Sequence, residues 1–396
     1  MATIIRQAYI DKIEKYLGKE TIIVLVGQRR VGKSYMMKTV RDQKASNPDN
    51  NIIYIDKEKR EFDSIRNYQD LNQYIDEHFV ASKHNYILID EIQDITEFER
   101  SIRSFRTEPN TDIIITGSNA KMLSSDVATT LGGRYITKHI LPYSFSEYLS
   151  ANNIPYDDMN IATTSGRADV QRYFAEYFRF GGFPEGAQLA SKRDYLNSVY
   201  QKIYIGDIAT RNKIDNLFSL RILFRKMAES VKQPTSFTRL SNIIASTGAK
   251  LGKATIINYI EYSKDAFLIY PIKNIADNLT NRETNPKYYF VDNGIISILE
   301  LDIDTSLLEN MVAMELIRRY GIDERVFFYN RNIEVDFYIP DAALAIQVSY
   351  NPHKTDETWQ RESSALIKFT KVLDCQRLLI LSYDTEETVE VNGKTI

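Results

Sequence analysis

The segment 21–38 constrains this chain most, because it joins an apolar strand to a helix through a glycine-rich loop with the pattern G-x4-G-K-S. Glycines let such a loop wrap so that its backbone N–H groups point at phosphate oxygens, and the start of the following helix adds partial positive charge. We expect Lys33 to reach the β- and γ-phosphates of a nucleotide and Ser34 to coordinate Mg²⁺. The residues expected to surround the phosphates are Gly27, Gln28, Arg29, Arg30, Val31, Gly32, Lys33, Ser34 and Tyr35.

A second apolar strand, 86–90, ends in two adjacent carboxylates, Asp90 and Glu91. An apolar strand ending in Asp-Glu is common by itself. When it follows a phosphate-binding loop (P-loop) of the kind described above, with one further strand between the loop and the Asp-Glu strand, it is typical of a Walker B motif. Asp90 is expected to hold Mg²⁺, directly or through water. Glu91 is expected to orient and polarise the attacking water, because phosphoryl transfer depends on such placement more than on covalent chemistry.

The next strand, 112–116, is followed by Gly-Ser-Asn. In P-loop ATPases with an inserted strand, this strand lies between the P-loop and Walker B strands. Ser118 or Asn119 is therefore a candidate for contacting the γ-phosphate or the attacking water. A helix cap is the alternative, since both residue types favour that position. Arg134 follows and is a candidate for stabilising γ-phosphate charge in its own or a neighbouring subunit, with a structural ion pair as its alternative.

Changes in the apolar pattern predict four domains. Residues 1–142 alternate strands and helices, and the near-continuous apolar strands are typical of a five-stranded parallel α/β sheet covered on both faces. Residues 143–232 show helical spacing and predict a helical lid. Residues 233–293 contain two short helices and then two strands, the order of a winged helix-turn-helix. Residues 294–396 predict a further α/β domain.

A basic segment lies within the predicted winged helix. Between Ser230 and Ile260 there is no Asp or Glu, although the chain has a formal net charge of −3. Lys250 and Lys253, near the start of the second helix, are candidates for contacting the phosphates of duplex DNA. The alternative is a protein-docking module. Because the chain as a whole is not a polycation, any affinity for nucleic acid must be local.

Composition favours a cytoplasmic protein. The single cysteine, Cys375, allows no disulfide within the chain, which fits a reducing compartment. The first residues lack the pattern of a signal peptide, and no apolar run approaches the ~18 residues of a membrane helix. The four histidines are scattered, so we expect no metal beyond nucleotide-bound Mg²⁺.

The chain resembles a prokaryotic family of AAA-type P-loop ATPases whose C-terminal domain is similar to restriction-endonuclease-like nucleases. The matching stretches span nearly the whole chain: GQRRVGKS, YILIDEIQ, ITGSNAKML, LGGRY, LPYSFSEYL, GGFPE, KYYFVDNGI, LLENMVAMEL and IEVDFYI. The resemblance implies an ATP-binding core, a helical lid, a winged helix and a nuclease-like terminal domain. It also implies ATP rather than GTP as the nucleotide.

The nuclease-like domain has an incomplete set of active-site residues. Nucleases of this type place Asp on one strand and Glu-x-Lys on the next, where carboxylates hold a metal and lysine positions water. Asp336 fills the first position, but Gln347 and Ser349 replace the expected Glu and Lys. Carboxylates that can compensate come from the flanking helices: Glu309, Glu315 and Glu362. The favoured interpretation is a degenerate domain that keeps the fold for a structural or partner-binding role.

Three functions follow from these patterns. The favoured one is a Mg²⁺-dependent ATPase that acts as a conformational switch on DNA or on a protein partner. The first alternative is an ATP-gated, metal-dependent nuclease, and the second is a nucleotide-dependent binding module with negligible turnover. The sequence leaves the partner and the oligomeric state open.

Overall fold

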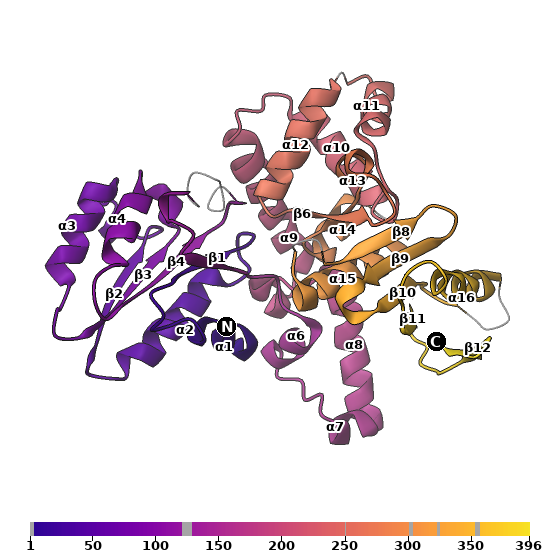
Figure 1. Ribbon diagram of the computed structural model, residues 1–396, viewed down its shortest axis with the longest axis horizontal. Coiled ribbons are helices and arrows are strands. Elements are labelled where there is room, and N and C mark those ends of the chain that lie inside the picture. The colour runs from indigo at the N-terminus through magenta and orange to yellow at the C-terminus, as the bar shows by residue number, and fades with distance from the viewer. Residues whose placement is uncertain (1–3, 121–128, 250, 301–303, 323–324, 353–356) are drawn as a thin grey trace. The chain divides into compact units, whose positions relative to one another are not determined.

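The computed structural model describes residues 4–120, 129–249, 251–300, 304–322, 325–352 and 357–396 (Figure 1). They form two compact units. The first comprises Met1–Ile154, Phe183–Gln188 and Asp265–Phe267, and the second comprises Pro155–Gly182, Leu189–Lys264 and Leu268–Ile396. Lys250, a predicted DNA contact, lies outside the described residues. None of the helices in the described ranges is long and apolar enough to cross a membrane.

The first unit is built on a five-stranded, fully parallel sheet in the order β2-β3-β4-β1-β5. Its strands are β1 (Ile22–Val26), β2 (Asn50–Asp56), β3 (His84–Asp90), β4 (Thr111–Gly117) and β5 (Tyr135–His139). Its helices are α1 (Gln7–Glu14), α2 (Lys33–Ala45), η1 (Arg60–Phe62), α3 (Tyr68–His78), η2 (Ile92–Asp94), α4 (Phe98–Phe105), α6 (Phe145–Ala151) and η4 (Pro184–Gln188). The predicted five-stranded parallel α/β sheet is confirmed, with β4 between β1 and β3.

Burial explains the arrangement of this sheet. Every residue of β1 and β4 is buried, because both strands are central and have neighbours on both sides. The residues of β5 are only half-buried at the edge. Because all strands run in one direction, the residues that follow β1, β3 and β4 meet at the same edge of the sheet. That edge holds the P-loop and the Walker B carboxylates.

The second unit contains a six-stranded mixed sheet in the order β11-β10-β9-β8-β6-β7. Its strands are β6 (Ile269–Asn274), β7 (Lys287–Phe290), β8 (Phe327–Asn330), β9 (Glu334–Ile339), β10 (Leu344–Val348) and β11 (Arg377–Leu381), and β12 (Glu390–Val391) pairs separately with β13 (Lys394–Thr395). Its helices are α7 (Asp158–Ala162), α8 (Thr164–Phe180), α9 (Lys192–Gln201), η5 (Lys202–Thr210), α10 (Leu217–Glu229), α11 (Phe237–Ser246), α12 (Lys253–Asp265), α13 (Leu279–Thr284), α14 (Asn293–Leu299), α15 (Asp304–Tyr320) and α16 (Glu357–Phe369), with a short η6 (Pro340–Ala342).

The two strands predicted as a wing belong to this larger sheet. The strands β6 and β7 pair antiparallel, as in a hairpin, but β6 also pairs parallel with β8 through Lys273↔Phe327 and Asn274↔Phe328. One sheet therefore contains strands from both sides of the predicted boundary between residues 293 and 294. A strand has two edges, and its sequence does not reveal which segments occupy them. The preceding segment 143–232 contains helices α6 to α10 and no strand.

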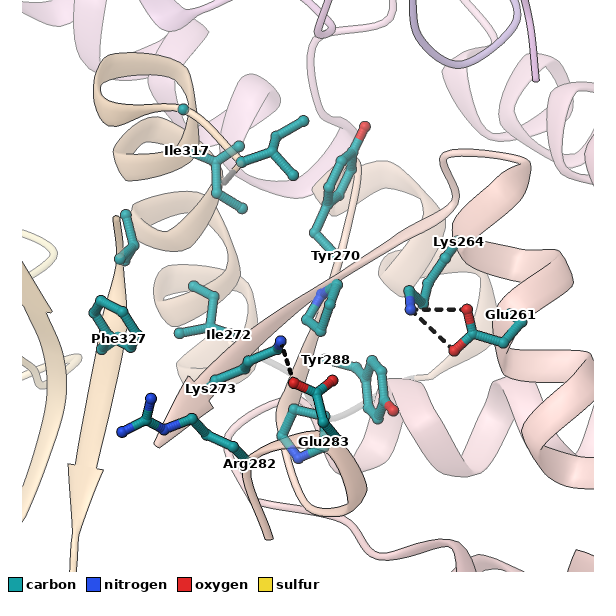
Figure 2. Close-up of a pocket in the computed structure, with 15 residues that line it drawn as sticks. Glu261, Lys264, Tyr270, Ile272, Lys273, Arg282, Glu283, Tyr288, Ile317 and Phe327 are labelled. Atoms are coloured by element: carbon teal, nitrogen blue, oxygen red, sulfur yellow. Dashed lines mark hydrogen bonds and ion pairs between the residues drawn. The ribbon is translucent and has the colours of Figure 1, made fainter. Parts of the chain in front are cut away.

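A small pocket opens where β6 and β8 diverge, with a volume of about 230 Å³. Pro271 lies on β6 just before the pairing with β8 begins, and it has no N–H to extend the ladder. Figure 2 shows Lys273 turned toward Glu283 and Lys264 turned toward Glu261. The two ammonium–carboxylate distances are 2.6 and 2.9 Å. Both lysines of the pocket are thus compensated within the second unit.

A buried turn centred on Asp292 brings together three of the sequence stretches that carry the family resemblance. The carboxylate of Asp292 accepts the N–H of Gly182 at 2.7 Å and that of Gly294 at 2.8 Å. A Cβ at Gly181 would lie 1.6 Å from Asp292 Oδ1, and the φ of Gly181 is +72°, so only glycine fits there. Burial raises the pKa of Asp292 to about 6, although these N–H groups oppose the shift.

A second set of hydrogen bonds surrounds that turn. The side chain of Asn293 donates to the carbonyls of Phe178 and Leu307, at 2.8 and 3.0 Å. The side chain of Asn310 donates to Asn293 Oδ1 and accepts the N–H of Phe290. The stretches GGFPE, KYYFVDNGI and LLENMVAMEL therefore meet in one buried polar network, whose hydrogen bonds offset the cost of burying polar groups.

Candidate nucleotide-binding site

The loop after β1 has the backbone geometry that its glycines predict. Gly27 has φ +147°, and a Cβ there would lie 2.2 Å from the carbonyl oxygen of Ile140. Gly32, with φ +98°, occupies the left-handed region at the start of α2. A side chain at Gly27 would push the loop away from the backbone at Ile140. Both glycines also avoid the strain that other residues meet at positive φ. The loop therefore wraps around the N-terminus of α2.

Lys33 lies deep in this loop, with only 4% of its surface exposed. Its ammonium donates hydrogen bonds to the carbonyls of Gly27 and Gln28, at 3.0 and 3.1 Å. It lies 3.8 Å from Glu91 Oε1. Two loop carbonyls and the carboxylate of Glu91 therefore hold the ammonium of Lys33 inside the loop.

Asp90 ends β3 beside the loop and is 1% exposed. Its Oδ1 accepts a hydrogen bond from the hydroxyl of Thr116 at 2.5 Å. Its Oδ2 is buried and has no hydrogen-bond partner among the described residues. Burial raises the pKa of Asp90, and hydrogen bonds from Ser34 and Thr116 oppose that shift.

These features fit a bound Mg²⁺. A buried carboxylate oxygen without a partner costs free energy unless a proton or a cation satisfies it. Ser34 and Asp90 supply the hydroxyl and carboxylate oxygens that Mg²⁺ takes beside substrate phosphates. No group of three or more His, Cys, Asp or Glu residues that could hold a metal occurs in the part of the chain that the structure describes. The site we expect needs one carboxylate, one hydroxyl and the phosphate oxygens.

Glu91 follows Asp90 in a left-handed conformation, with φ +52°. Non-glycine residues adopt this region rarely, and such strain is found at functional sites. Ser118 and Gln93 both donate to Glu91 Oε2, at 2.9 and 2.5 Å. Burial alone would raise the pKa of Glu91, but Lys33 and these hydrogen bonds outweigh it and lower the pKa below its usual value. Glu91 is therefore an ionised carboxylate at neutral pH.

Two segments distant in sequence also reach the P-loop within the first unit. Glu185 pairs with Arg30 at 2.5 Å, both side chains being about half exposed, and Pro184 lies 3.9 Å from where a Gly32 Cβ would stand. The buried amide of Gln28 donates to the carbonyl of Ala266 at 2.7 Å. The sequence predicts a turn around Pro184 and a strand that begins at Phe267, but it gives no sign that either segment reaches the P-loop.

Sequence analysis also missed Arg6. Its guanidinium, 5% exposed, donates to the P-loop carbonyl of Val31 at 3.1 Å and to that of Leu141 at 2.9 Å. It also pairs with both carboxylate oxygens of Glu147 at 2.8 Å. Glu147 closes a capping box with Ser144 at the start of α6. The stretch LPYSFSEYL thus holds the arginine that supports the P-loop.

The structure places the other predicted catalytic residues in two different regions. Ser118 lies at the site, 1% exposed and bonded to Glu91, and Asn119 is 5% exposed beside it. Arg134 does not lie beside these residues in its own subunit. It is exposed, and its carbonyl accepts the N–H of Ile22 at the start of β1, whereas the P-loop follows the end of β1.

The reason is the direction of β5. Because β5 runs parallel to β1, the chain must return to the opposite edge of the sheet before β5 begins. From the rise per residue of a β-strand, the length of β1 places that edge about 13 Å from the end of β1. A role for Arg134 at a neighbouring subunit's site stays a prediction.

Two of the predicted nuclease positions, Asp336 and Glu309, meet at a lysine that the sequence did not single out. Lys287 on β7 is fully buried, and its ammonium lies 3.2 Å from Glu309, 3.3 Å from Asp336 and 3.6 Å from Glu334. Burial lowers the pKa of Lys287, but these carboxylates outweigh it and raise the pKa above its usual range. An ammonium group therefore occupies the centre of this carboxylate cluster.

The remaining positions have partners of their own. Gln347 accepts the N–H of Asp336 and donates to the carbonyl of Glu334, both at 2.9 Å. Ser349 donates its N–H to the carbonyl of Leu381. Glu315 pairs with Arg318 and Arg319, and Glu362 pairs with Arg361. Neither Gln347 nor Glu315 contacts Lys287.

Comparison with known proteins identifies the family. The profile of an AAA domain matches residues 19–149, and that of a domain of unknown function (DUF8612) matches residues 171–307. An uncharacterized protein of Haemophilus influenzae is 32% identical over 371 residues, which cover 90% of each chain. The chain belongs to the same family as this Haemophilus protein and contains an AAA-type P-loop ATPase domain. An uncharacterized protein of Methanocaldococcus jannaschii is 29% identical over 393 residues, 96% of this chain and 87% of the other.

Solved structures give further similarities for this AAA-type chain. The Walker-type ATPase of Pyrococcus abyssi matches with a TM-score of 0.47 and 14% identity, covering 76% of this chain and 98% of that one. AMPPCP-bound DnaA from Aquifex aeolicus matches with a TM-score of 0.28 and 16% identity, covering 65% of this chain and 87% of that one. The family assignment rests on the AAA profile and on the Haemophilus relative.

Proposed function

We propose that the chain is a Mg²⁺-dependent ATPase that works as a nucleotide-driven conformational switch. The observation that carries this proposal is the juxtaposition of Lys33, Asp90 and Glu91 at one edge of the parallel sheet. A phosphate-binding lysine, a carboxylate with an unpartnered oxygen and an ionised second carboxylate are the parts that phosphoryl transfer to water requires.

Each residue then has one role. The N–H groups of the P-loop and the start of α2 bind the phosphates, and Lys33 moves from its loop carbonyls to the β- and γ-phosphates. Ser34 and Asp90 would hold Mg²⁺, which would supply positive charge beside the phosphates. Glu91 orients the attacking water, and Ser118 and Gln93 fix the direction of its carboxylate.

The test separates binding from hydrolysis. Wild type should bind a fluorescent ATP analogue and turn over ATP with Mg²⁺. Lys33→Ala should lose binding, whereas Glu91→Gln should keep binding and trap ATP. Exposed Lys83→Ala, on the loop before β3, serves as the matched lysine control. ATP binding without turnover in wild type, unchanged by Glu91→Gln, would support the binding-module alternative instead.

Duplex DNA is the partner that we propose for the helices α11 and α12. Lys253 begins α12 and is exposed, and the window from Ser230 to Ile260 has no acidic residue, so this helix start favours phosphate contact. DNA should stimulate ATP turnover at low salt and less at moderate salt, and Lys253→Ala should weaken that stimulation. Turnover that ignores DNA would favour a protein partner.

Nuclease activity is the less favoured alternative. The ammonium of Lys287 already compensates Glu309 and Asp336, and Gln347 bonds to the backbone of β9. Support for a nuclease would be Mn²⁺ binding, measured by calorimetry, that Asp336→Asn abolishes. We therefore propose a structural or partner-binding role for this part of the chain.

A further inference from the structure

The hydroxyl of Thr116 joins the two Walker B carboxylate residues. It donates to Asp90 Oδ1 at 2.5 Å and accepts the N–H of Glu91 at 2.9 Å. Thr116 is fully buried near the end of β4, which pairs directly with β3. One oxygen atom therefore fixes the carboxylate of Asp90 and the backbone of Glu91 at the same time.

This bridge matters because Glu91 is held in a disfavoured backbone conformation and Asp90 is buried with one oxygen lacking a partner among the described residues. Glu91 adopts φ +52°, a conformation that persists only where the surroundings impose it. The hydrogen bond from the N–H of Glu91 to the hydroxyl of Thr116 is one such constraint. The donation to Oδ1 of Asp90 also leaves Oδ2 as the oxygen without a partner, which is the atom suited to a cation. The hydroxyl thus selects which carboxylate oxygen remains available.

We propose that Thr116 is a positioning residue for Mg²⁺ and for the attacking water, acting through Asp90 and Glu91. The proposal rests on the ATPase function proposed above and adds a residue whose observed contacts are with Asp90 and Glu91. Removal of the hydroxyl frees Asp90 to rotate and removes the acceptor of the Glu91 N–H. Metal affinity and the geometry of the base should therefore weaken together.

The experiment compares Thr116→Val, which keeps the shape of the side chain, with Thr116→Ser, which keeps the hydroxyl. Thr111→Val is the control, because Thr111 begins the same strand and its hydroxyl donates to the nearby carbonyl of Pro109, away from both carboxylates. For each variant, fluorescent ATP binding is titrated with Mg²⁺ and also measured in excess EDTA. Steady-state kcat and KM are measured beside them.

A hydrogen bond to a charged group predicts an effect of about tenfold or more. Thr116→Val should bind nucleotide like wild type in EDTA but need at least tenfold more Mg²⁺ for its metal-dependent binding. Its kcat should fall at least tenfold, with KM changed less than about threefold. Thr116→Ser should restore both, and Thr111→Val should match wild type.

Two results would overturn the proposal. If Thr116→Val keeps the Mg²⁺ dependence and kcat of wild type, the bridge has no positioning role, although the ATPase proposal stands. If Thr116→Ser is as impaired as Thr116→Val, shape rather than the hydroxyl matters. Failure of wild type itself to bind Mg²⁺-ATP would remove the ATPase proposal, and this one with it.

Discussion

The ammonium nitrogen of Lys287 lies 3.3 Å from Oδ1 of Asp336, the residue at the first of the nuclease-like positions of the sequence. Glu309 and Glu334 complete its surroundings, and Tyr289 donates its hydroxyl to Glu309 at 2.8 Å. The buried ammonium of Lys287 thus compensates the buried carboxylate of Glu309 and the more exposed carboxylates of Asp336 and Glu334. Where the resemblance implies Glu and Lys, the chain has Gln347 and Ser349, and the positive charge beside Asp336 comes from Lys287 instead.

Removal of that charge should destabilise the second unit strongly. Lys287→Met leaves the buried carboxylate of Glu309 without its cation, for which the expected cost is about 3–5 kcal/mol. Urea unfolding, with hydrogen exchange over β7 and β9, measures the loss. Lys264→Met, which removes a half-exposed ion pair, should cost less than about 1 kcal/mol. Equal effects of the two substitutions would contradict the role of Lys287.

The same cluster should not bind a divalent metal. Because Lys287 repels a second cation, calorimetric titration of Mn²⁺ into nucleotide-free protein should show no heat that depends on Asp336. Asp336→Asn is the matched variant, since it keeps the size of the side chain. A binding isotherm present in wild type and absent from Asp336→Asn would restore the metal-dependent alternative.

Asp292 predicts a pH dependence of stability. Its pKa is about 6 in the folded chain and near 3.8 when unfolded, so the folded state holds the proton more tightly. The stabilisation is full below pH 4 and is lost as the pH rises through 6, by about 3 kcal/mol in all.

The measurement compares the urea midpoint of wild type with that of Asp292→Asn, which stays neutral throughout. The difference, wild type minus variant, should become less favourable to wild type between pH 4 and 6. A difference that is flat over this range would show that Asp292 does not change its proton affinity on folding.

Gly27 provides a local test of the P-loop geometry. Gly27→Ala places a methyl group 2.2 Å from the carbonyl of Ile140 at φ +147°, so the loop must shift. We expect loss of ATP binding with at most a modest fall in melting temperature. Gly18→Ala, also at positive φ but with open space around it, controls for backbone strain. Retention of ATP affinity in Gly27→Ala would show that the close approach is dispensable.

The sequence indicates the candidate nucleotide site because the motifs that form it are local. Apolar runs predicted the five strands of the first sheet, and residues that follow parallel strands must meet at one edge. Lys33, Asp90, Glu91 and Ser118 therefore lie together as expected. The direction of β5 explains why Arg134 lies elsewhere. The residue before a parallel strand lies at the opposite edge of the sheet from the residues that follow the strands.

The second unit was less predictable because its key contacts join distant segments. Lys287 precedes Asp336 by 49 residues and reaches it across a sheet whose strand order is not sequential. Asp292 meets Gly182 across 110 residues. Neither pair leaves a periodic pattern, so composition and spacing give no signal for them.

The most direct test of the account is ATP turnover by wild type and by Glu91→Gln, with Mg²⁺ present and nucleotide binding measured in the same samples. The account predicts that both proteins bind ATP and that only wild type hydrolyses it at a substantial rate. Normal hydrolysis by Glu91→Gln would contradict the role of Glu91, and absence of binding in both would contradict the nucleotide site itself.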